Sequence, residues 1–293
     1  MCQLLGMNCN TPTDMVFSFQ GFSLRGGLTA QHADGFGIAF FDGKGVRCFR
    51  DPNACYDSSL AQFLRTYPIR TLNAIAHVRK ASQGEKLTVN THPFIRELWG
   101  QYWVFAHNGQ LDNFSFSKGE YYHSVGDSDS EQIFCYILEG LRTRFGRHEP
   151  NESALFNALA DIICGLKGKG LLNFLLSNGK WMIAHCSHLL FYTLRHSPFG
   201  EAELVDEDFK IDFSKVTTLQ DKVAVIATLP LTRNETWEQL AKDELIVFKN
   251  GAITYRKKPE NSYYYSIEEG QKIAQAYACL LYTSDAADDL LCV

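Results

Sequence analysis

Cys2 is the residue whose position alone suggests chemistry, because only Met1 precedes it. A small residue at the second position favours removal of the initiator methionine, which leaves a cysteine with both a thiol and a free α-amine. That amine has a reference pKa of about 7.7–8.0, so it is suited to act as the base for its own thiol. An ordinary thiol on a first strand is the alternative, and the other polar clusters of the chain must decide between the two.

Three clusters further along the chain contain the other groups that a thiol-dependent amidase needs. Arg79 is suited to hold a substrate carboxylate through a pair of hydrogen bonds. Asn108 and Gly109 can direct a side-chain and a backbone N–H at a developing oxyanion, where one such donor contributes roughly 2.7–4 kcal/mol. An aspartate of the Gly-Asp-Ser-Asp-Ser-Glu run at 126–131 can hold a substrate ammonium. Together they indicate an amino-acid substrate with an amide on its side chain.

Each cluster taken singly also has a purely structural interpretation. An Asn-Gly pair after a strand is typical of a hairpin turn, and an arginine is typical of a surface ion pair. An aspartate or serine directly before a helix is a typical cap. Histidines at such positions are more often hydrogen-bonded structural residues than ligands or bases. These interpretations apply to Asn108, Arg79, Asp127, Ser128, His77, His92 and His107.

The composition is typical of a globular protein with a large core in one or two domains. The chain has 293 residues, of which 45% are hydrophobic and 21% are charged. A formal charge of −5 without blocks of Lys or Arg gives no reason to expect nucleic acid or a membrane as a partner. Because no long apolar run or signal-peptide pattern is present, we expect a cytoplasmic protein. Nine cysteines without a Cys-x-x-Cys pair predict free thiols and no metal site.

Hydrophobic periodicity predicts the elements that must position these clusters. Apolar runs predict strands at 2–7, 34–41, 46–50, 73–78, 102–106, 171–177, 181–186, 189–194, 223–229 and 245–248. Apolar spacing predicts helices at 58–67, 128–145 and 151–166. Residues 11–14 have the composition of a turn and of a helix cap before a mixed apolar stretch to Leu24, and 204–213 have that of a charged loop. The three strands from 171 to 194 are predicted to form a meander with a turn at Asn178-Gly179.

The order of the elements is strands, then two adjacent helices, then strands again. This order favours an α+β fold over a doubly wound parallel sheet, which needs strands and helices in alternation. Arg25, before two glycines, is interpreted as the end of a helix rather than as a gate of the pocket. Residues 279–293 resemble read-through of an adapter used in DNA sequencing, with an ordinary C-terminal helix as the alternative, and we expect no function from them.

The joint order of these clusters resembles one family, the class II glutamine amidotransferases. The matching features are Cys2, the His-x-Arg stretch that ends at Gly84, Asn-x-His-Pro at 90–93, His-Asn-Gly at 107–109 and Asp-x-Glu at 129–131. The runs at 34–37 and 91–100 resemble the short, stand-alone branch of that family. The resemblance implies a four-layer αββα sandwich of two mainly antiparallel sheets, as in N-terminal-nucleophile hydrolases. It assigns 2–255 to the amidotransferase domain and 256–278 to a C-terminal extension.

The resemblance also implies a role for each site residue. Cys2, after loss of Met1, would attack the side-chain amide of glutamine, form a γ-glutamyl thioester and release ammonia, while its α-amine relays the proton. Asn108 and Gly109 would stabilise the oxyanion. Arg79 would bind the α-carboxylate of the substrate, and Asp129 its α-ammonium. We expect no metal ion or organic cofactor to be needed for this chemistry.

The sequence departs from the family pattern directly after Arg79. Better-known members carry Trp and then Thr-His before the glycine, whereas this chain has Lys80, Ser82 and Gln83 in that segment. We expect Ser82 to replace the threonine in substrate binding. Lys80 and Gln83, together with His92, are candidate residues of an altered pocket, which leaves room for a larger γ-glutamyl substrate.

Three functions are therefore compatible with the sequence. The first is a glutamine amidohydrolase, the second a hydrolase of a γ-glutamyl peptide or γ-glutamyl thiol compound, and the third a catalytically idle regulatory protein on the same fold. The intact set of site residues argues against the third. Because only about forty residues follow position 250, we expect a separate subunit to accept any ammonia that is transferred, or simple hydrolysis of the small-molecule substrate.

Overall fold

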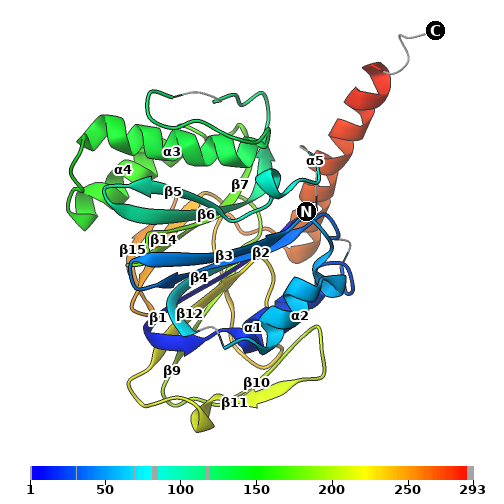
Figure 1. Ribbon diagram of the computed structural model, residues 1–293, viewed down its shortest axis with the longest axis vertical. Coiled ribbons are helices and arrows are strands. Elements are labelled where there is room, and N and C mark those ends of the chain that lie inside the picture. The colour runs from blue at the N-terminus through cyan, green and yellow to red at the C-terminus, as the bar shows by residue number, and fades with distance from the viewer. Residues whose placement is uncertain (1, 31, 69, 81–84, 117–118, 289–293) are drawn as a thin grey trace.

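The computed structural model describes residues 2–30, 32–68, 70–80, 85–116 and 119–288, and side chains as far as residue 277. Two antiparallel sheets pack face to face, and a pair of helices covers the outer face of each sheet (Figure 1). The layers therefore run helix, sheet, sheet, helix. The predicted α+β fold with its αββα arrangement is confirmed.

Over the described residues, the first sheet has seven strands in the order β13-β9-β12-β1-β4-β2-β3. These strands are β1 (Gln3–Asp14), β2 (Phe36–Asp42), β3 (Gly45–Asp51), β4 (Arg70–Val78), β9 (Phe191–His196), β12 (Lys222–Ala227) and β13 (Glu238–Gln239). Strand β1 lies inside the sheet, and its Leu5 stands opposite Ala227 on one side and Ala76 on the other. Cys2 therefore directly precedes a strand that neighbours fix on both sides.

The second sheet, in the part of the chain that the structure describes, has six strands in the order β15-β14-β8-β7-β6-β5. These strands are β5 (Phe94–Leu98), β6 (Gln101–Leu111), β7 (Gly170–Ser177), β8 (Met182–Cys186), β14 (Glu244–Lys249) and β15 (Ala252–Lys257). A separate hairpin is formed by β10 (Glu201–Glu203) and β11 (Lys210–Asp212). Strand β5 pairs with β6 only as far as Phe105, so the rest of β6 has β7 as its one strand neighbour in the described part of the sheet.

The three helices predicted from apolar spacing are confirmed as α2 (Ser59–Thr66), α3 (Asp129–Phe145) and α4 (Glu152–Cys164), and local capping explains where they begin. The described residues also form α1 (Val16–Leu24), α5 (Ile267–Asp288) and the short 3-10 turns η1 (Cys55–Asp57), η2 (Thr88–Asn90) and η3 (Phe213–Lys215). Ser58, Ser128 and Asn151 each precede a helix and accept hydrogen bonds from its first backbone N–H groups. Helix α5 projects away from the sandwich (Figure 1).

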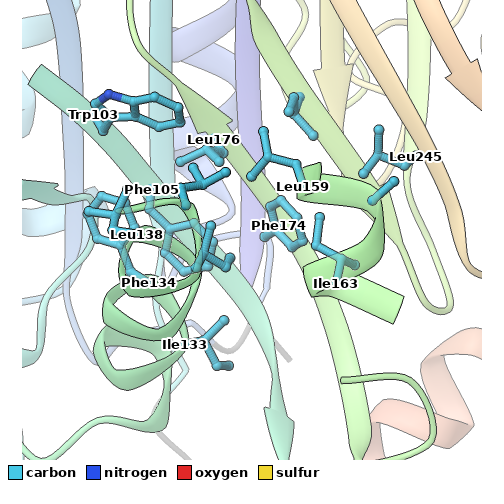
Figure 2. Packing of buried hydrophobic residues seen from close by; sticks show 14 of the residues in the cluster. Trp103, Phe105, Ile133, Phe134, Leu138, Leu159, Ile163, Phe174, Leu176 and Leu245 are labelled. Carbon is cyan, nitrogen blue, oxygen red and sulfur yellow. The ribbon is translucent and has the colours of Figure 1, made fainter. Parts of the chain in front are cut away.

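Three apolar layers hold the sandwich together. Figure 2 shows Phe134 and Leu138 of α3 and Ile163 of α4 facing Phe105 and Phe174 of the second sheet. The rings of Phe105 and Phe134 stack with centroids 5.1 Å apart. A second layer lies between α1, α2 and the first sheet, and a third lies between the two sheets. Burial of a large apolar side chain contributes about 1.5–3 kcal/mol, so these layers dominate the stability of the fold.

Several predicted elements differ from the structure. The turn predicted at 11–14 is wrong, because β1 continues to Asp14 after a shift in its register with β4 between Asn8 and Thr13. Asp14 Oδ1 does accept a hydrogen bond from Val16 N–H at 2.8 Å at the start of α1, as expected of a capping residue. The predicted meander is wrong at its third strand, because β9 pairs with β12 in the other sheet and not with β8. The predicted loop at 204–213 contains β11, and neither β5 nor β15 was predicted. The first two differences depend on strand partners that are distant in sequence. Strands β5, β11 and β15 instead form hairpins with their sequence neighbours β6, β10 and β14.

The seven described cysteines are all free thiols, as predicted. In the described part of the chain, no helix is both long enough and apolar enough to span a membrane. Across the same residues, no three His, Cys, Asp or Glu side chains are grouped closely enough to hold a metal ion.

Candidate functional site

The alternation of the strands places the candidate residues between the two sheets. Three residues of the apolar layer between the sheets come from three different strands, namely Leu4, Ala106 and Ile226. Side chains two positions apart on a strand point to the same face. Continuing each strand by two residues therefore directs Cys2, Asn108 and Thr228 into the gap between the sheets.

The Cys2 thiol lies against the backbone that follows β4. Its Sγ is 3.3 Å from the backbone nitrogen of Lys80 and 3.3 Å from the oxygen of the same residue. Cys2 keeps partial contact with solvent, but protein atoms surround the sulfur densely. Burial raises the pKa of the Cys2 thiol, against the lowering effects of the Lys80 N–H and the Arg79 charge. The thiol is therefore mainly protonated near neutral pH and needs a base.

Arg79 is buried, and its backbone N–H and carbonyl groups are both hydrogen-bonded. Its N–H donates to Gly35 O at 2.8 Å, and its carbonyl accepts from Asp34 N–H at 3.1 Å. Its Nη1 donates to Glu85 O at 3.1 Å. Asp34 also forms an ion pair with Lys86. The backbone bonds hold Arg79 directly after the end of β4, and the bond to Glu85 O holds one nitrogen of its guanidinium.

Asn108 and Gly109 lie within strand β6, so the interpretation of this pair as a hairpin turn is wrong. Asn108 stands opposite Asn173 of β7, and Gly109 stands opposite Leu172. A Cβ atom on Gly109 would lie 2.0 Å from Leu171 O, so only glycine allows the two strands to pair this closely. The twofold alternation of the ladder, rather than a turn, sets the direction of both residues.

The backbone N–H of Gly109 points toward the edge of β6 that faces the start of α3. Leu111 N–H donates to Asp129 Oδ2 at 3.0 Å on that edge. N–H groups two residues apart on a strand point to the same side, so Gly109 N–H shares the edge with Asp129. Asp129 is the first residue of α3, where the helix dipole favours a carboxylate. An N–H donor and a buried carboxylate are thus brought together.

His107 and Ser130 determine how the second oxygen of Asp129 is used. Burial lowers the pKa of His107, so the imidazole is neutral. Its Nε2 lies 3.0 Å from Leu171 O and therefore carries the proton, which leaves Nδ1 to accept from Ser130 Oγ at 2.9 Å. Ser130 has one hydroxyl proton, and this geometry directs it to His107 rather than to Asp129 Oδ1 at 3.3 Å. Asp129 Oδ1 consequently retains capacity to accept a hydrogen bond from a ligand.

His77 and His92 pack against each other in the interior, with ring centroids 4.2 Å apart. Burial lowers the pKa of both imidazoles well below the usual value. Among the described residues their ring nitrogens make no hydrogen bond of standard geometry, so the expectation of hydrogen-bonded histidines holds for His107 and is wrong for this pair. His92 is therefore a neutral packing residue in the structure. Ser82 and Gln83 lie outside the described residues.

Two hydrogen bonds that the sequence did not predict join η2 to the start of α3. Asn90 and Asp127 exchange hydrogen bonds, from Nδ2 to Oδ1 at 2.5 Å and from the backbone N–H of Asp127 to Asn90 Oδ1 at 3.2 Å. Asp127 thus holds η2 against the start of α3, while Ser128 caps the helix. Arg25 is the C-terminal cap of α1, as favoured, and its Nε donates to Asp206 at 2.8 Å. In the sequence, the one signal that pointed to Asp127 was its position in the polar run at 126–131.

Comparisons with known proteins agree with this geometry. The family model described as "Glutamine amidotransferases class-II" matches residues 1–269. A Haemophilus influenzae protein named "Putative glutamine amidotransferase" is 54% identical over 251 residues, covering 86% of this chain and 85% of the relative. The crystal structure of a "predicted glutamine amidotransferase" from Pseudomonas aeruginosa superposes with a TM-score of 0.69 at 39% identity, covering 87% of this chain and all of that one. A Mycobacterium tuberculosis "Gamma-glutamyl-hercynylcysteine sulfoxide hydrolase" is 33% identical over 138 residues, 44% of this chain and 55% of the relative.

Proposed function

Because this chain belongs to the class II glutamine amidotransferases, we propose that it is an amidohydrolase whose nucleophile is Cys2. After removal of Met1, the Cys2 sulfur attacks the side-chain carbonyl carbon of glutamine. The C–N bond breaks, ammonia leaves and a γ-glutamyl thioester remains. Water then hydrolyses the thioester to glutamate and regenerates the thiol. Overall, glutamine and water become glutamate and ammonia.

The observation that carries this proposal is the common placement of four groups. The Cys2 thiol and the Asn108 amide occupy the same gap between the sheets, and the Gly109 N–H shares an edge of β6 with Asp129. In the proposed reaction, Asn108 Nδ2 and Gly109 N–H stabilise the oxyanion of the tetrahedral intermediate. Loss of one such donor costs roughly 2.7–4 kcal/mol in the barrier.

The charged residues select the amino-acid part of the substrate. Arg79 binds the α-carboxylate, and the available Oδ1 of Asp129 binds the α-ammonium. The raised pKa of the Cys2 thiol explains why a base is required, and the α-amine that Met1 removal exposes supplies it. That amine takes the thiol proton and returns it to the leaving ammonia.

A second candidate is hydrolysis of a larger γ-glutamyl compound. Its support is the partial likeness to the γ-glutamyl-hercynylcysteine sulfoxide hydrolase and the presence of Lys80 next to the thiol, where better-known family members carry a tryptophan. In both candidates we assign the amidase to residues 2–255, with 256–278 as an extension. Transfer of the ammonia to a separate acceptor subunit is a further possibility within the first candidate.

The test combines mass spectrometry with a glutamate-release assay. The purified protein should lack Met1, and a diazo-ketone analogue of glutamine should add once to the wild type and to Cys164→Ala, which changes an exposed thiol. Cys2→Ala should neither be labelled nor release glutamate. Faster release from γ-glutamyl dipeptides than from glutamine would favour the second candidate. An intact Met1, or failure of both labelling and turnover, would overturn the mechanism and favour an idle protein.

A further inference from the structure

Thr228 is a buried residue that links the strand after Cys2 to Asn108. It follows β12 directly, and its side chain is fully buried. The backbone N–H of Leu4 donates to Thr228 Oγ1 at 2.9 Å, and the N–H of Thr228 donates to Leu4 O at 3.1 Å. These two bonds fix the position of the hydroxyl oxygen relative to a residue two positions from Cys2.

In the orientation that the structure gives it, the Asn108 amide has a hydrogen-bond partner in the described chain at its nitrogen but not at its oxygen. Its Nδ2 lies 3.3 Å from Thr228 Oγ1, while its Oδ1 is buried and has no partner among the described residues. A hydroxyl group has one proton to donate and two lone pairs. As the amide stands, the Leu4 N–H and Asn108 Nδ2 both donate to Thr228 Oγ1, so its two lone pairs are used and its buried hydroxyl proton has no acceptor among the described residues. A buried acceptor without a donor costs about 1–3 kcal/mol.

Rotating the Asn108 amide by half a turn gives both the Thr228 hydroxyl proton and Asn108 Oδ1 a hydrogen-bond partner. Because the oxygen and nitrogen ends of an asparagine are assigned from their partners, the position 3.3 Å from Thr228 can equally hold the oxygen. Oδ1 then accepts the Thr228 proton, and Nδ2 occupies the position that has no protein partner. In that position, Asn108 Nδ2 gains a hydrogen-bond acceptor only when the oxygen of a ligand binds there. Catalytic hydrogen bonds of this kind often shorten when substrate binds.

We propose that Thr228 is the positioning residue that orients the Asn108 amide, by donating its hydroxyl proton to Oδ1 so that Nδ2 faces the substrate carbonyl. This inference rests on the proposed function. Thr228 acts through Asn108 and does not touch the substrate. Its contribution is therefore made in the transition state, where the oxyanion forms, and not in the binding of the α-carboxylate or α-ammonium.

The experiment compares Thr228→Ser with Thr228→Val in the glutamate-release assay. The serine retains a hydroxyl and should keep kcat within about threefold of the wild type. The valine has a similar shape without the hydroxyl, and its kcat should fall about 10- to 100-fold with little change in KM, less than the 10²–10³ expected for outright loss of a donor. Alkylation of Cys2 by iodoacetamide, which needs no oxyanion donor, should continue at the wild-type rate.

A double-mutant cycle separates this role from a purely structural one. In an Asn108→Ala background, Thr228→Val should cause no further loss of kcat, because the residue through which it acts is absent. Equal losses in both backgrounds, or an active Thr228→Val, would overturn the role of Thr228 while the proposed function stands. A wild type without amide hydrolysis would overturn both. If Thr228→Val does not fold, Thr228→Ala serves in the same cycle, and a large loss in Thr228→Ser also counts against the inference.

Discussion

Gly109→Ala is the substitution whose effect follows most directly from the structure. The added Cβ would lie 2.0 Å from Leu171 O and 2.8 Å from His107 Nε2, whereas real Cβ contacts almost never fall below 3.0 Å. Strands β6 and β7 must therefore separate locally by about 1 Å. That shift also breaks the 3.0 Å contact between His107 and Leu171. The closest clash is with a backbone atom, Leu171 O, so rotation of a side chain cannot relieve it.

The magnitude follows from the contacts that are lost. Overpacking costs about 1–3 kcal/mol, and the weakened hydrogen bond adds about 1 kcal/mol. The total of about 2–4 kcal/mol corresponds to a fall in Tm of about 3–7 °C for a chain of this size. Displacement of the oxyanion donors by about 1 Å should in addition reduce kcat about 100-fold.

Thermal unfolding and glutamate release, measured on the same samples, test both effects. Gly200→Ala is the matched control, because a Cβ there meets nothing within 4 Å. Its stability should change by no more than about 0.5 kcal/mol. A Gly109→Ala protein with the Tm and kcat of the wild type would refute the claim that close pairing of β6 with β7 positions the site.

Two further predictions concern stability. Asp206→Asn leaves the buried guanidinium of Arg25 without its carboxylate, so the free energy of unfolding measured in urea should fall by about 3 kcal/mol. The control is Asp42→Asn, which changes an exposed ion pair and should leave the free energy of unfolding nearly unchanged. Equal effects of the two substitutions would contradict this prediction. The second prediction concerns pH. Burial lowers the pKa of His185 to about 4, whereas its pKa in the unfolded chain is about 6.5. The unfolded chain therefore binds a proton first, and stability is lost as the pH falls from 6.5 to 4. His185→Asn should reduce that loss by up to ~3 kcal/mol, and unfolding curves with equal pH dependence would count against it.

The helices could be predicted because their signals are local. Ser58, Ser128 and Asn151 cap helices whose apolar stripes recur within a few residues, so nearby sequence is sufficient. The candidate site residues could be named because their types and order resemble those of a family. Their roles stay predictions, but the structure places Cys2 against Lys80 and Gly109 on the same edge as Asp129.

Strand partners could not be predicted in the same way. The Asn108-Gly109 pair has the composition of a turn, yet pairing with β7 keeps it extended, since tertiary contacts outweigh local preference. Strand β9 follows β8 closely in sequence but belongs to the other sheet. Periodicity shows which side of a strand is buried, but it contains no information about which strand lies beside it.

The amino-acid sequence thus determines which chemical groups are present, the order in which they occur and the α+β class, because these depend on residue type and local spacing. The tertiary structure decides which groups meet. Thr228 lies 224 residues from Leu4, and no local pattern connects the two. Their contact arises because β12 packs beside β1, and the same contact places a hydroxyl next to Asn108. The orientation of one amide in the site therefore depends on long-range strand pairing.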